Sequence, residues 1–243
     1  MSVCCALYTF TSTVHSHIMT LCSLYNYACI LYRYTWCIAH VVNYLSRAYF
    51  KRNPRSSMAH WLQAPDIVVT HHRMGDVLDP KMVKKQTGKA WFDQKHITPS
   101  YAIASTRCLI KMAVAAGQHN PRVVLLAEAV PSHPEVKEII KALAPVKVTL
   151  LNEAALDTPH AFQLMTNSYY LSVESHNAFG RVAAVFTQGT VLAADMGTGV
   201  SDKEFNGNDG NPLFHSVSNV LPNGTTTDWE TAFCQLKMCQ CHD

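Results

Sequence analysis

The sequence predicts an α/β fold with a Rossmann-like parallel sheet and helices on both of its faces. Three observations support this class. Short aliphatic or β-branched runs alternate with helix-forming stretches roughly every 20–25 residues, the pattern of repeated β-α-β units. Hydrophobic residues make up 48% of the 243 residues and charged residues only 15%, a balance that suits a globular core. The regular pattern covers residues 66–200, which we take as the Rossmann-like domain.

Five strands are expected. Each is a run of aliphatic or β-branched residues bounded by polar or turn-forming residues, as is typical of a strand buried in a parallel sheet. They are residues 66–70, 122–128, 146–151, 169–174 and 190–194.

Four helices are expected between these strands, at residues 99–116, 134–143, 158–165 and 177–188. Apolar residues recur in them at helical spacing. Their ends carry the usual signals: Pro134 stands in a first turn, Thr158 is a suitable N-cap, and Gly117 closes the first helix. Because connections between parallel strands are right-handed, the helices should cover both faces of the sheet.

Residues 1–65 form an N-terminal segment of different composition. They contain no Asp or Glu, and the apolar and aromatic run at 18–32 ends at Arg33. This run is shorter than the about 20 residues that span a bilayer. Two interpretations stay open. A signal anchor or interfacial helix would associate the chain with a membrane and place it in the secretory pathway, such as the Golgi. The other interpretation is a poorly structured extension.

Residues 201–243 are expected to be rich in loops, because Gly, Asn and Pro cluster at 205–213. Asn223-Gly224-Thr225 forms a glycosylation sequon that is compatible with a secretory-pathway lumen. Eight of the 9 cysteines lie outside residues 66–200, so we expect a core that is not built on disulfides. The cysteines near the C-terminus match no common zinc spacing, and no metal site is expected.

Charge and motifs exclude several functions. The net charge is only +3 and no cluster of Lys or Arg forms a phosphate-tracking stripe, so nucleic acid is not an expected partner. No G-x-G-x-x-G follows a strand and no G-x4-G-K-[ST] occurs, which argues against a nicotinamide or flavin cofactor and against a P-loop.

Polar residues follow the predicted strands at their carboxyl ends, where ligands bind in open α/β sheets. The first exit carries His71, His72, Arg73, Gly75 and Asp76. The later exits carry Glu128 at the second strand, Asn152 and Glu153 at the third, and Glu174, Ser175, His176 and Asn177 at the fourth. We expect these side chains to gather at one edge of the sheet.

Arg73 is the strongest candidate for a ligand contact, because a guanidinium is always charged and its planar fork suits phosphate. Gly75 permits a close backbone approach. Asp76 could pair with Arg73, cap the turn or act on a substrate, and His71 and His72 are alternative acid–base candidates. Ser175 could cap the next helix or contact an anion at its N-terminus. A purely structural Arg–Asp pair and plain helix capping remain alternatives.

Two blocks, HHRMGD and LMTNSYYLSVESHNAFGRVAAVFTQGTVL, resemble the fucosyltransferase superfamily with its α-1,2-, α-1,6- and protein O-fucosyltransferase branches. The family's His-x-Arg-x-Gly/Thr-Asp motif falls here on His71, Arg73, Gly75 and Asp76. The second block is similar to the family's later strand–helix motif. Its matching positions are Ser175, Asn177, Phe179, Ala183 and Ala184.

The resemblance implies the donor-binding half of a GT-B-type glycosyltransferase. Such an enzyme would be inverting and metal-independent, would need no cofactor, and would transfer sugar from GDP-fucose or a related nucleotide sugar to a glycan or protein acceptor. Arg73 would bind the β-phosphate and stabilise the leaving GDP, with His71 and Asp76 as further catalytic candidates. The donor-binding residues would be Arg73, Gly75, Glu128, Ser175, His176 and Asn177. The alternative is a non-catalytic or truncated nucleotide-sugar-binding remnant, because Met74 replaces a second arginine of the family motif.

Overall fold

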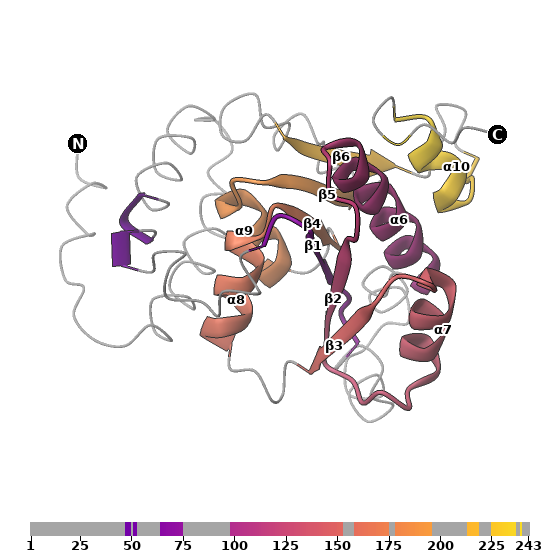
Figure 1. Cartoon of the computed structure of the whole chain (residues 1–243), viewed down its shortest axis with the longest axis horizontal. Coiled ribbons are helices and arrows are strands. Elements are labelled where there is room, and N and C mark those ends of the chain that lie inside the picture. The colour runs from indigo at the N-terminus through magenta and orange to yellow at the C-terminus, as the bar shows by residue number, and fades with distance from the viewer. Residues whose placement is uncertain are drawn as a thin grey trace.

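Six parallel strands form one sheet in the computed structural model of the chain, in the order β3-β2-β1-β4-β5-β6 (Figure 1). The predicted α/β Rossmann-like class is confirmed. The structure describes residues 47–49, 51–52, 64–74, 98–152, 158–174, 178–195, 213–218, 225–236 and 239. The expected signal anchor or extension within residues 1–65 lies largely outside these ranges, as does the sequon at Asn223.

The elements agree closely with the predicted ones. The strands are β1 (Ile67–His71), β2 (Arg122–Ala127), β3 (Val148–Asn152), β4 (Tyr170–Val173), β5 (Thr190–Asp195) and β6 (Phe214–Ser218). The helices are α6 (Pro99–Ala115), α7 (Pro134–Leu143), α8 (Thr158–Asn167), α9 (Ala178–Phe186) and α10 (Trp229–Cys234). Two elements, β6 and α10, lie in the segment that we expected to be loop-rich. The sheet therefore extends beyond residue 200.

Helices cover both faces of the sheet, and successive strand residues point to opposite faces. On β1, Val68 belongs to the core beneath α6, α7 and α10, whereas Ile67 and Val69 belong to the core beneath α8 and α9. Figure 1 shows these two sets of helices on opposite sides of the sheet. The near-continuous apolar strands of the sequence follow from this double burial.

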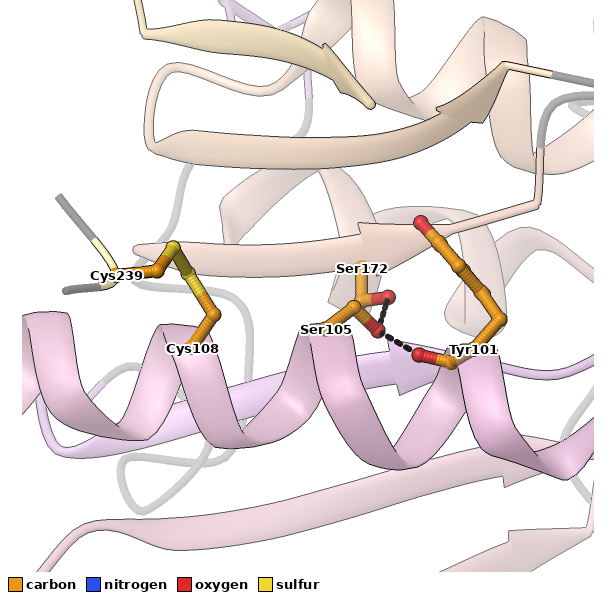
Figure 2. Close-up of a disulfide and its surroundings, with 5 residues drawn as sticks. All are labelled: Tyr101, Ser105, Cys108, Ser172 and Cys239. Carbon is orange, nitrogen blue, oxygen red and sulfur yellow. Dashed lines mark hydrogen bonds between the residues drawn. A yellow bond between two sulfur atoms is a disulfide. The ribbon is translucent and has the colours of Figure 1, made fainter. Parts of the chain in front are cut away.

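A polar seam joins α6 to the centre of the sheet. The hydroxyls of Thr70 and Thr106 lie 2.6 Å apart, and Ser105 Oγ lies 2.6 Å from Ser172 Oγ. Figure 2 shows Ser105 and Ser172 meeting between the helix and β4. All four side chains are buried, and each hydroxyl has a hydrogen-bond partner, as buried polar groups require. The seam fixes α6 against β1 and β4.

A disulfide joins Cys108 of α6 to Cys239 (Figure 2). Both cysteines are buried, and Cys234 is disulfide-bonded as well. The expectation of a core without disulfides is therefore wrong at this position. Cys108 is the lone cysteine of residues 66–200, and its partner is 131 residues away, so the distribution of cysteines along the chain gave no sign of the pairing.

Replacing both Cys108 and Cys239 by alanine is expected to lower the free energy of unfolding by about 3 kcal/mol. The bond closes a loop of more than 100 residues and so restricts the unfolded chain. The check is urea unfolding of both proteins in non-reducing buffer. Equal unfolding midpoints would contradict the prediction.

Candidate functional site

The topological switch point of the sheet, at the carboxyl ends of β1 and β4, is the candidate site. From β1 the chain moves to β2 and β3 on one side, and β4 then returns to the other side of β1 and leads on to β5. Ligands bind at such a switch point in open α/β sheets. His72 and Arg73 directly follow β1, and Glu174 directly follows β4. The topology thus brings together residues about 100 positions apart in the sequence.

His72 lies between two carboxylates. Its Nδ1 is 2.5 Å from Glu174 Oε1, and its Nε2 is 3.1 Å from Glu135 Oε2. Glu135 comes from the first turn of α7, where its backbone N–H donates to the ring of the N-cap residue His133. A carboxylate is favoured there by the helix dipole. The exposed fractions are 0% for the His72 side chain, 1% for Glu174 and 20% for Glu135.

The geometry assigns a charge to His72. Ionised carboxylates only accept hydrogen bonds, so both ring nitrogens must carry a proton. Burial opposes this charge, but the hydrogen bonds and negative charges of Glu135 and Glu174 outweigh burial and raise the pKa of His72 to about 9. At neutral pH His72 is therefore a buried imidazolium between Glu135 and Glu174.

Glu174 also contacts the backbone of Arg73, whose N–H donates to Oε1 over 3.2 Å. Its second oxygen, Oε2, is buried and has no hydrogen-bond partner among the described residues. Buried carboxylate oxygens are usually satisfied, so an acceptor in this condition calls for a donor from a ligand or from water. This acceptor thus belongs to the carboxylate that holds the backbone of Arg73.

Tyr101 of α6 is fully buried near Glu174. Its hydroxyl donates to the backbone oxygens of Val173, at 2.8 Å, and Leu192, at 3.2 Å. Burial raises the pKa of Tyr101 above its usual value, and the nearby Glu174 charge acts in the same direction. The phenol is therefore a neutral group that holds α6 against the end of β4 and the middle of β5.

The structure separates the two adjacent histidines. His71, the last residue of β1, is buried against α9, and a Cβ on Gly180 would lie 3.1 Å from its Nδ1. Its ring centroid is 6.1 Å from that of Phe179. Of the two predicted acid–base candidates, His71 thus packs toward α9, and His72 forms the cluster with Glu174 and Glu135.

The remaining predicted site residues divide into two groups. Arg73 is half-buried directly after β1, and Glu128 follows β2 with an exposed side chain. The other five lie outside the described residues: Gly75, Asp76, Ser175, His176 and Asn177.

The sequence analysis placed two members of the cluster at strand exits, His72 after the first strand and Glu174 after the fourth, with His72 as an alternative acid–base candidate. It did not predict that these two side chains pair with each other. Glu135 could not be predicted as a member of the cluster, because an acidic residue is common in the first turn of a helix, where it interacts favourably with the helix dipole.

The fold and site define an α/β protein with Rossmann topology and an ionised, buried cluster at its switch point. Comparisons with protein families, curated proteins and solved structures find no match to the chain. Among the described residues, no group of three or more His, Cys, Asp or Glu side chains is suited to hold a metal ion. No helix in the same part of the chain is long and apolar enough to cross a membrane.

Proposed function

We propose that the switch point between β1 and β4 binds the diphosphate of a nucleotide sugar, and that the protein is a fucosyltransferase-like glycosyltransferase. The donor is GDP-fucose or a related nucleotide sugar, transfer is inverting and metal-independent, and the acceptor is a glycan or a protein. One observation carries the proposal. Arg73 stands at the switch point of a Rossmann sheet, directly after β1, with its backbone hydrogen-bonded to Glu174.

The charges of the cluster are compatible with an anionic ligand. Two buried or half-buried carboxylates alone would repel a diphosphate, but the His72 imidazolium lies between them. Arg73 then supplies a further positive charge, and a guanidinium that faces a departing diphosphate stabilises the transition state. Glu174 Oε2 offers an acceptor for a hydroxyl or N–H of the same ligand.

A second candidate is a protein that binds the nucleotide sugar without transferring it. Met74 takes the place of the second arginine of the fucosyltransferase motif, and its side chain is 1% exposed within the core beneath α6. A second guanidinium therefore has no place at this position. A site with Arg73 but no second arginine can still bind the nucleotide sugar, but it stabilises the departing GDP less.

Replacing Arg73 by alanine is expected to weaken GDP binding roughly 10- to 100-fold, the usual contribution of charge-assisted hydrogen bonds. Isothermal titration of GDP, GDP-fucose and UDP into both proteins measures this loss. Arg107→Ala is the matched control, because it removes an exposed guanidinium that pairs with Glu230 on the surface. Its affinity should stay within about twofold of the wild type.

The outcomes separate the two candidates. Binding of GDP-fucose with release of free fucose, lost in Arg73→Ala, supports the transferase. Binding without turnover supports the non-catalytic alternative. No binding of any nucleotide overturns both, and a preference for UDP removes GDP-fucose from the proposal.

A further inference from the structure

The backbone of Arg73 is held by a side chain after the sheet ladder has ended. The last ladder bond at this edge is donated by His72 N to Leu126 O, at 2.9 Å. The next backbone N–H, that of Arg73, donates to Glu174 Oε1. This same oxygen is 2.5 Å from the His72 ring. One carboxylate oxygen therefore ties together the exits of β1 and β4.

The cluster is an expensive arrangement for stability alone. Burying a carboxylate and an imidazolium costs several kcal/mol per ion, and the pair offsets this cost only when all of its hydrogen bonds are made. Glu174 leaves Oε2 without a partner among the described residues, so the site falls short of that condition. Polar groups that are incompletely satisfied in a buried site are a feature of functional positions.

We infer that Glu174 is a positioning residue for Arg73. With Oε1 locked against the His72 imidazolium, Glu174 fixes the backbone from which the Arg73 guanidinium reaches the phosphate of the ligand. The inference rests on the proposed nucleotide-binding function. As a positioning residue, Glu174 strengthens binding of the anionic ligand. Its charge alone would weaken this binding, because a carboxylate repels a nearby anion.

The sign of the effect makes the test decisive. Glu174→Gln keeps the shape of the side chain and removes the negative charge. If the charge alone mattered, GDP would bind more tightly; if Glu174 positions Arg73, GDP binds about tenfold more weakly. Glu138→Gln, an exposed carboxylate of α7 outside the cluster, is the matched control for the change in net charge.

A double-mutant cycle then links the two residues. In the Arg73→Ala background, Glu174→Gln should cause no further weakening, because there is no guanidinium left to position. Unchanged or tighter binding of GDP by Glu174→Gln would overturn the inference. The inference would also be overturned if Glu174→Gln weakened GDP binding by the same factor in the Arg73→Ala protein as in the wild type. Circular dichroism and thermal unfolding establish that each variant is folded.

A measurement on the wild-type protein needs neither a variant nor a nucleotide. The Arg73 amide proton and the His72 ring are followed by NMR from pH 7 to pH 10. The charged groups that contact His72 are Glu135 of α7 and Glu174. Arg73 is its neighbour in the chain, and Tyr101 of α6 stays neutral over this pH range. The amide signal should move with the His72 titration near pH 9, because both protons share Oε1. An amide signal that stays fixed while the ring titrates would overturn the positioning role.

The NMR result and the nucleotide titrations together distinguish the two ways of failing. If the amide signal moves but the protein binds no nucleotide, the proposed function fails instead.

Discussion

Replacing Glu174 by leucine is expected to lower the free energy of unfolding by about 3–5 kcal/mol at pH 6, the usual cost of breaking a buried ion pair. Leucine has a similar volume but cannot accept a hydrogen bond. His72 would then stay buried with Glu135 as its carboxylate partner, and the backbone N–H of Arg73 would lose its acceptor. Urea unfolding followed by tryptophan fluorescence measures the difference between the two proteins.

The pH dependence of this difference identifies His72 as the cause. The folded-state pKa of His72 is about 9, against an unfolded value of 6.5. A raised folded-state pKa stabilises the protein fully below pH 6.5, and this stability is lost as the pH rises through 9. The contribution amounts to about 3 kcal/mol. The gap between wild type and Glu174→Leu should therefore be widest at pH 6 and narrow toward pH 10.

Glu230→Leu is the matched control for this experiment. Glu230 is a carboxylate of α10 that pairs with Arg107 at 2.7 Å, with both side chains largely exposed. Exposed ion pairs contribute less than about 1 kcal/mol, and no pH-dependent gap from the wild type is expected near pH 9. If the gap for Glu174→Leu were instead constant from pH 6 to pH 10, the His72 charge would not depend on Glu174.

The sequence predicted the first five strands because their signal is local. Runs such as IVVT at 67–70 are buried on both faces and read as continuous apolar segments between polar ends. β6 has no such signal, since FHSVS follows a stretch rich in Gly, Asn and Pro. Its stability comes from parallel pairing with β5, for example Ala193 with Ser216. Tertiary pairing of this kind leaves no mark on the local composition.

The sequence predicted at which edge of the sheet the candidate site lies, but not which side chains contact one another there. The strand-exit rule located Arg73 correctly at the edge of the sheet. Choosing between His71 and His72 required the face that each side chain points to, and hence which helix covers that face. Glu135 meets His72 only because α7 begins beside the end of β1, 63 residues apart in the sequence. Such a contact depends on the complete arrangement of β1, β2 and α7.

Replacing Gly189 by alanine is expected to destabilise the protein by at least about 4 kcal/mol, beyond the usual range for a single substitution. Gly189 lies between α9 and β5, and a Cβ there would lie 2.3 Å from Tyr169 O and 2.5 Å from Ser168 O. Both atoms belong to the backbone, so no side-chain rotation relieves the overlap. Tyr169 O also accepts the hydrogen bond from Thr190 N, at 2.8 Å, that starts β5. Moving this carbonyl would disturb the pairing of β4 with β5.

Gly117→Ala is the control that separates steric overlap of an added Cβ from strain of the backbone conformation. Gly117 has a φ of 90°, but a Cβ there would meet no atom within 4 Å. Only the strain of a left-handed backbone remains, about 1–2 kcal/mol. Urea unfolding of both variants should therefore give a clearly larger loss for Gly189→Ala. Equal losses of unfolding free energy in the two variants would contradict the prediction. They would mean that the backbone at Ser168 and Tyr169 moves away from residue 189 at little cost and admits a methyl group.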